Sequence, residues 1–144
     1  MKLDDILSLW KEDSIIDITE LGEEAIKISK LLQKYYEILI NEKKVLLKYE
    51  NEMKILRLAK HEFFTQGHNE ETMSKGWTLP AKGIILKQDM PMYLDADQDV
   101  INLSLKIGLQ QEKVDYLDSI IRSLQQRGYS IKSAIEWHKF TMGG

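Results

Sequence analysis

The stretch that decides the fold of this chain is residues 21–66, LGEEAIKISKLLQKYYEILINEKKVLLKYENEMKILRLAKHEFFTQ. Its apolar residues recur mostly at alternating steps of three and four, the heptad spacing of one helical seam. This seam comprises Leu21, Ala25, Ile28, Leu32, Tyr35, Leu39, Leu46, Tyr49, Met53, Leu56 and Phe63. Because no proline or internal stop signal precedes Gly67, the pattern predicts one long helix over about residues 18–66.

Two polar residues, Glu42 and Lys60, interrupt this seam, and further apolar residues widen it. The widening residues are Ile26, Leu31, Ile38, Val45, Ile55 and Phe64. A stripe this long cannot cover itself, and it is broader than the strict seam of a two-stranded coiled coil. We therefore expect several helical neighbours and self-association.

A short amphipathic helix is predicted to precede the long one. Its apolar face would carry Leu3, Ile6, Leu7 and Trp10. Further along, residues 17–20 place Asp17 three positions before Glu20, which is a variant of the capping box. We expect the long helix to begin at this box.

The segment after the long helix lacks its continuous heptad pattern. Glycines and prolines separate short apolar pieces, which predicts an irregular or hairpin insert over about residues 67–95. The punctuating residues are Gly67, Gly76, Pro80, Gly83 and Pro91.

Two further helices are predicted beyond the insert. A second capping-box variant, residues 95–98, precedes a heptad pattern with Gln110 as its one polar member, so we expect a helix over about 96–127 that ends near Gly128. Ser130 would cap a last helix over about 130–141. The predicted fold is mainly α, with long heptad-bearing helices and one insert, in a single domain of residues 1–144.

The composition narrows the class of protein. With 144 residues and 43% hydrophobic content, the chain fits one globular domain. Cysteine is absent, so disulfides and thiolate metal sites are excluded. Asp4 and Asp5 are unlike a signal peptide, and no apolar run approaches the roughly 20 residues that cross a bilayer. We expect a cytoplasmic protein without membrane contact.

The sequence contains no recognisable catalytic pattern. A nucleophile elbow is missing, and the glycines stand too far apart for a phosphate-binding loop. The three histidines, His61, His68 and His138, lie outside any zinc-binding motif. We therefore expect no enzymatic activity, no metal and no cofactor.

The most informative polar feature is a basic cluster at the end of the long helix. Lys54, Arg57 and Lys60 crowd against Phe63 and Phe64. Cations neutralise phosphates and aromatic faces stack on unpaired bases, so this combination indicates binding of single-stranded DNA. The alternative is an ordinary solvated face with both phenylalanines in the core. Since adjacent helical positions point about 100° apart, we expect one phenylalanine in each role.

Three groups of residues, in this order along the chain, resemble the UvsY family, recombination mediators of large tailed bacteriophages. The first group is MKLDDI (1–6), KED (11–13), IDITEL (16–21) and SKLLQK (29–34). The second is the basic stretch that ends in Phe63 and Phe64. The third is LDADQDV (94–100) with RGYSIK (127–132) and Phe140. The insert around residues 77–91 departs from the family pattern.

The resemblance implies a function and a set of residues. The family's single-stranded DNA contact would correspond to Lys54, Arg57, Lys60, His61, Phe63 and Phe64. Its assembly segment would correspond to Ile131, Ala134, Ile135, Trp137 and Phe140. The protein would form ring-like or open-barrel hexamers or heptamers. It would load a RecA-like phage recombinase onto DNA covered by the phage single-strand-binding protein, in the cytoplasm of an infected bacterium.

A structural coiled-coil protein, such as a phage assembly scaffold, is the alternative from a different class. It would explain the heptads equally well and would leave the basic cluster as a solvated surface. Strong, salt-sensitive binding to single-stranded DNA separates the two.

Overall fold

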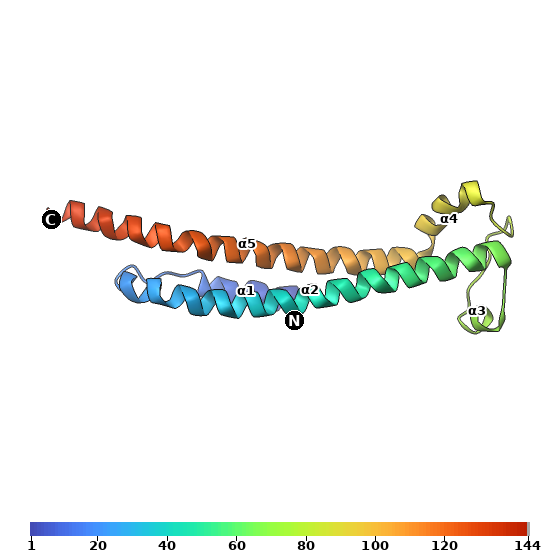
Figure 1. The fold of residues 1–144 in the computed structure, drawn as a ribbon, viewed down its shortest axis with the longest axis horizontal. Helices are drawn as coiled ribbons and strands as arrows, with labels where there is room; N and C mark the ends of the chain where they lie inside the picture. Colours follow the sequence, from blue (N-terminus) through green and yellow to red (C-terminus); the bar gives the residue numbers. More distant parts are fainter. Residues whose placement is uncertain (144) are drawn as a thin grey trace. The chain divides into compact units, whose positions relative to one another are not determined.

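The fold was analysed in a computed structural model that describes residues 1–143 (Figure 1). These residues contain helices and no β-strand, so the prediction of a mainly α chain is confirmed. The elements are α1 (Leu3–Asp13), α2 (Leu21–Gln66), α3 (Glu70–Ser74), a 3-10 turn (Lys87–Asp89), α4 (Met90–Ala96) and α5 (Gln98–Thr141). The predicted short first helix and long second helix are both present.

The chain forms two compact units where the sequence predicted a single domain. The first unit contains Met1–Lys44 together with the chain from Gln110 onward, and the second contains Val45–Leu109. Each of the two long helices contributes one part to each unit. The insert lies wholly within the second unit.

The first unit consists of α1 packed along the two long helices, which run antiparallel within it (Figure 1). Trp10 of α1 meets Tyr35 of α2 edge to face, with ring centroids 5.7 Å apart. Arg127 of α5 donates hydrogen bonds to the carbonyl oxygens of Asp13 at 3.0 Å and Ser14 at 3.3 Å, where α1 ends. The buried apolar core of this unit comprises Ile6, Tyr35, Leu39, Val114, Leu117, Ile120, Ile121, Leu124 and Ile131.

Both predicted capping boxes are misplaced. Helix α2 begins at Leu21, because the Asp17 carboxylate accepts hydrogen bonds from the amide and hydroxyl of Thr19 in a local turn. Helix α5 begins at Gln98, and its capping carboxylate belongs to Asp97, which accepts the Val100 amide at 3.1 Å. Asp17 thus accepts the Thr19 amide instead of capping α2, and Asp97, not Asp95, caps α5.

The predicted break between residues 127 and 130 is wrong, because α5 continues through it to Thr141. Gly128 costs about 1 kcal/mol relative to alanine inside a helix, but the apolar stripe continues across it from Leu124 to Ile131, both buried. Ser130, expected to be a cap, donates its hydroxyl to the Gln126 carbonyl one turn back. Packing of the continuous stripe outweighs the local stop signal.

The two polar interruptions of the helical seams, Glu42 of α2 and Gln110 of α5, meet in the first unit. The Gln110 side-chain amide donates to the Glu42 carboxylate at 2.6 Å and to its main-chain carbonyl at 2.8 Å. The amino group of Met1 lies 3.2 Å from the same carboxylate, and the ammonium group of Lys113 lies 3.9 Å away. Burial alone would raise the pKa of Glu42, but these partners together hold it below its ordinary value of 4.5.

Replacing Gln110 with leucine is expected to lower the free energy of unfolding by about 1 to 3 kcal/mol at pH 7, because the buried Glu42 carboxylate loses its closest donor. A lowered folded-state pKa adds stability that is complete above the unfolded value and lost as pH falls through the folded value. The deficit of the variant should therefore shrink below about pH 4.5. Urea unfolding at pH 7 and pH 3 measures this, with the exposed Gln111→Leu as control. An equal deficit at both pH values would contradict it.

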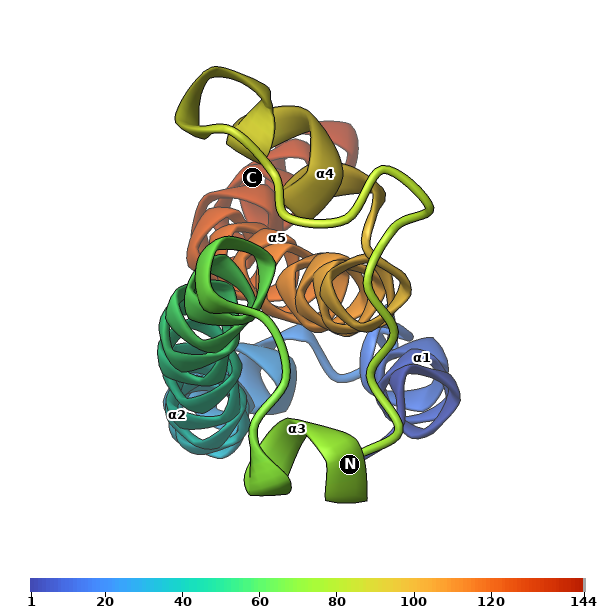
Figure 2. The same ribbon diagram turned by 90° about the vertical axis from the view of Figure 1, so that its right-hand side faces the viewer.

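The second unit has an apolar core at the end of α2. The insert folds around this end of the helix (Figure 2). Gly67 ends that helix with a φ of 84°, and its amide donates to the Phe63 carbonyl at 2.9 Å. The insert then passes through α3 and α4, which lie on opposite sides of the helix end, and it forms no hairpin. The buried core comprises Phe63, Phe64, Ile85, Met90 and Leu94, with Trp77, Leu79 and Tyr93 packed against it.

Candidate nucleic-acid interface

The predicted basic cluster lies on the last turns of α2, but its three cations have different surroundings. Lys54 is exposed and takes part in no ion pair within the described part of the chain. Arg57 is half-buried, and Lys60 is only 4% exposed. His61 is exposed beside them. The exposure of the three cations decreases from Lys54 to Lys60, because Lys60 occupies a seam position that faces the interior.

Lys60 is neutralised inside the second unit. Its ammonium group lies 2.8 Å from the carboxylate of Asp99 and 3.2 Å from that of Asp97. It also lies 3.9 Å from the centre of the Trp77 ring, where a cation is attracted to the aromatic face. A buried ammonium group requires partners of this kind. Lys60 therefore faces the α4–α5 junction in this structure and does not point into solvent.

Arg57 is paired more loosely. Its guanidinium lies 3.2 Å from the carboxylate of Asp95, whose side chain is 70% exposed. An ion pair with this much solvent contact contributes about 0 to 1 kcal/mol, so its partner can be exchanged for another anion. Lys54 and Arg57 are thus the two cations of the cluster that a DNA phosphate reaches most directly.

The prediction that one phenylalanine is exposed for base stacking is wrong. Phe63 is 2% and Phe64 is 4% exposed, so both are core residues. Adjacent side chains do diverge around a helix, but the insert folds over the end of α2 and covers both directions. Phe63 contacts Trp77 edge to face at 5.5 Å, and the Ile85 amide donates to the Phe64 carbonyl at 2.9 Å.

The residues that surround the cations do not stand out in the sequence. Asp95 and Asp97 have the pattern of a helix cap there, and Trp77 lies in the irregular insert. One signal was available: a lysine at a seam position needs a buried partner, and the acidic run of residues 95–99 precedes the next seam. The identity of the partner depended on how the insert folds back.

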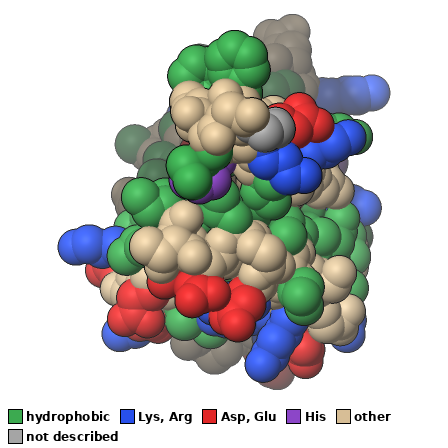
Figure 3. Space-filling model, turned by 90° about the vertical axis from the view of Figure 1, so that its left-hand side faces the viewer, with side chains coloured by type: hydrophobic (Ala, Val, Ile, Leu, Met, Phe, Trp, Pro, Cys, Tyr) green, Lys and Arg blue, Asp and Glu red, His purple; other side chains and the backbone are tan. Residues whose placement is uncertain are grey.

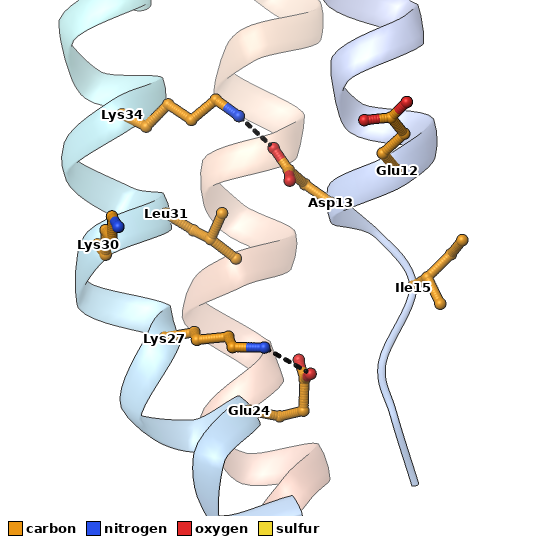
Figure 4. A pocket seen from close by; sticks show the side chains of 8 residues that line it. All are labelled: Glu12, Asp13, Ile15, Glu24, Lys27, Lys30, Leu31 and Lys34. Carbon is orange, nitrogen blue, oxygen red and sulfur yellow. Dashed lines mark hydrogen bonds and ion pairs between the residues drawn. The ribbon is translucent and has the colours of Figure 1, made fainter. Parts of the chain in front are cut away.

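A second group of lysines, on α2 in the first unit, lines a groove of about 440 Å³ (Figure 4). Its lysines largely satisfy carboxylates within the groove: Lys34 lies 2.7 Å from Asp13, and Lys27 lies 3.4 Å from Glu24. Burial alone would raise the pKa of Asp13, but the Lys34 and Tyr35 hydrogen bonds and the charges of Lys34 and Arg127 lower it. The groove is therefore charge-compensated and is a weaker candidate for phosphate binding than the end of α2.

The residues predicted for assembly are divided between two sides of α5. Ile131 is buried in the first unit and Ile135 is half-buried, whereas Ala134 is exposed. Trp137 and Phe140 are 66% and 75% exposed, and their rings stack on each other at 5.8 Å. Hydrophobic side chains are also visible at this end of the molecule in Figure 3. An exposed aromatic pair of this size is uncommon unless a partner covers it.

Residues 1–143 contain no group of three or more histidine, cysteine, aspartate or glutamate side chains arranged to hold a metal ion. None of their helices is both long and apolar enough to span a membrane.

Comparison with known proteins gives a consistent result. Residues 9–144 match the family model described as "Recombination, repair and ssDNA binding protein UvsY". The recombination protein uvsY of Enterobacteria phage T4 is 24% identical over 144 residues, which is 99% of each chain. Two crystal structures of the bacteriophage T4 recombination mediator protein UvsY share the fold. One has a TM-score of 0.83 at 24% identity, over 99% of this chain and 98% of that one. The other has a TM-score of 0.78 at 23% identity, over 98% and 99%. The chain belongs to the UvsY family of recombination, repair and single-stranded DNA binding proteins.

Proposed function

We propose that this protein is a recombination mediator that binds single-stranded DNA and promotes loading of a RecA-like phage recombinase onto DNA covered by single-strand-binding protein. The observation that carries the proposal is the family match over residues 9–144. The protein acts by binding and positioning rather than by catalysis. Its direct test is recombinase filament formation on covered single-stranded DNA with and without this protein, and no acceleration would argue against it.

The DNA contact in this proposal is electrostatic and centres on Lys54 and Arg57. Both lie on successive turns of one rigid helix, so a single strand can run past them with its phosphates near both groups. His61 extends the contact, and Lys60 joins it only where a phosphate takes the place of the half-exposed Asp99 carboxylate. Base stacking by Phe63 and Phe64 has no part in it, because those rings hold the second unit together.

Self-association supplies the affinity that two or three cations lack. Each contact alone is weak and salt-sensitive, but several copies held in one assembly present their patches to the same strand at a high effective concentration. We propose a ring-like or open-barrel hexamer or heptamer that forms through the exposed end of α5. Recombinase and single-strand-binding protein then meet a strand that the assembly already holds.

Replacing Lys54 and Arg57 together with glutamine is expected to weaken binding to single-stranded DNA and to reduce the salt dependence. The slope of log affinity against log salt should fall by about 1.4, at about 0.7 for each lost phosphate contact. Fluorescence titration of labelled oligonucleotide at several salt concentrations measures both changes.

The control is Lys87→Gln, which removes one exposed lysine elsewhere in the second unit that forms no ion pair within residues 1–143. It should leave the slope within error of the unmodified protein. If the control and the double variant lose affinity equally, binding depends on general charge and the site assignment fails. If the unmodified protein itself shows no salt-sensitive binding to single-stranded DNA, a structural coiled-coil role is favoured.

A further inference from the structure

We propose that Asp95 and Asp99 are intramolecular competitors of DNA: they occupy Arg57 and Lys60 in the free protein and are displaced when phosphates bind. These two aspartates are called the acidic cover below. The inference rests on the proposed DNA contact at the end of α2 and adds a device that regulates it. The geometry that carries it lies entirely within the second unit.

Each aspartate of the acidic cover forms an ion pair with one cation of the basic cluster. The Asp95 carboxylate lies 3.2 Å from Arg57, and the Asp99 carboxylate lies 2.8 Å from Lys60. Carboxylates and phosphates compete for the same donors of a guanidinium or ammonium group. Among residues 1–143, Lys54 is the one cation of the cluster without such a partner. The free protein therefore presents less positive charge to DNA than its sequence suggests.

The acidic cover can be released without dismantling the fold. The side chains of Asp95 and Asp99 are 70% and 51% exposed, so each carboxylate can turn into water when a phosphate takes its place beside the cation. Asp97 differs, because it is mostly buried and caps α5 through the Val100 amide. Asp97 and the Trp77 ring keep Lys60 in contact with the insert when Asp99 leaves. Asp97 is therefore structural, whereas Asp95 and Asp99 on either side of it can exchange their partners.

The test compares variants that each remove one negative charge from the second unit. Asp95→Asn and Asp99→Asn release cations of the DNA contact, whereas the control Glu50→Gln removes an exposed carboxylate that pairs with no cation in the described residues. Asp95→Asn should bind single-stranded DNA about fivefold more tightly, the factor that corresponds to an exposed ion pair of about 1 kcal/mol. Asp99→Asn should also gain affinity, because a phosphate then reaches Lys60 without a competing carboxylate. The control should gain less than about twofold from its general charge effect. Gains no larger than that of Glu50→Gln would overturn the inference.

A double-mutant cycle separates release of a specific cation from a general change in charge. With Arg57→Gln in the background, Asp95→Asn should give no gain beyond that of Glu50→Gln, because the cation that it releases is gone. A gain that persists without Arg57 overturns the inference. Both residues are solvent-exposed enough for the variants to fold, which the melting temperature verifies.

The same measurements distinguish failure of this inference from failure of the proposed function. If Arg57→Gln weakens DNA binding but the cover variants do not strengthen it, the DNA contact stands and the acidic cover is only structural. If Lys54 and Arg57 can be replaced without any loss of DNA binding, the site itself is wrong.

Discussion

A Phe63→Ala variant is expected to lose about 3 to 5 kcal/mol of unfolding free energy, because the ring is fully enclosed and its removal leaves a cavity. The ring is in contact with Phe64, His68 and Trp77, so the cavity would open at the centre of the second unit. Urea unfolding followed by circular dichroism and by tryptophan fluorescence measures the loss and whether the insert detaches first.

The matched control is Leu58→Ala on the same helix, where the side chain is exposed. It should change stability by no more than about 0.5 kcal/mol, the usual range for surface substitutions. The result also decides between the two roles considered for Phe63. A variant of unchanged stability that loses DNA binding would show that the ring stacks on bases after all.

Replacing Trp137 and Phe140 together with serine is expected to convert a large oligomer into smaller species. Their exposed rings are the most prominent apolar surface at the end of α5, and each aromatic residue can bury about 150 to 250 Å² against a partner. Helical content should not change, since neither ring belongs to the core of the first unit. Affinity for long single-stranded DNA should fall about 100-fold, because the linked patches act separately. Light scattering and DNA titration on the same samples measure both effects.

The control for this pair is Leu105→Ser with Leu109→Ser, two exposed leucines of the same helix that lie in the second unit. The proposal requires that their replacement leaves the oligomer mass unchanged. If the leucine variant dissociates and the aromatic variant does not, assembly occurs along the middle of the long helices.

Much of the fold follows from the sequence, because long helices depend on a repeating pattern. The heptad seam predicted a helix over about residues 18–66, against Leu21–Gln66 in the structure. The seven-residue step between Leu124 and Ile131 favours a continuous α5 when it is given more weight than Gly128. The errors arise where a local signal competes with packing. A glycine stops an isolated helix, but neighbouring apolar contacts outweigh its cost of about 1 kcal/mol.

The candidate site could be predicted only in part. The residues that bring positive charge to the end of α2 are adjacent in sequence, so their clustering was visible. Whether each charge is free depended on Asp95, Asp99 and Trp77, which reach the helix only through the tertiary fold of the insert. Periodicity carries no information about such contacts, and the same limit explains why Phe63 and Phe64 were assigned different roles.

The contact between Glu42 and Gln110 favours one register of α5 against α2, because the apolar seams of the two helices are otherwise repetitive. A slip of α5 by one heptad along α2 would still pair apolar residues with apolar residues, but it would bring the Glu42 carboxylate against Leu117 in place of Gln110. An unpaired carboxylate in such a setting costs several kcal/mol. The polar pair therefore specifies the register of α2 against α5 within the first unit, which the repetitive apolar seams alone would leave ambiguous.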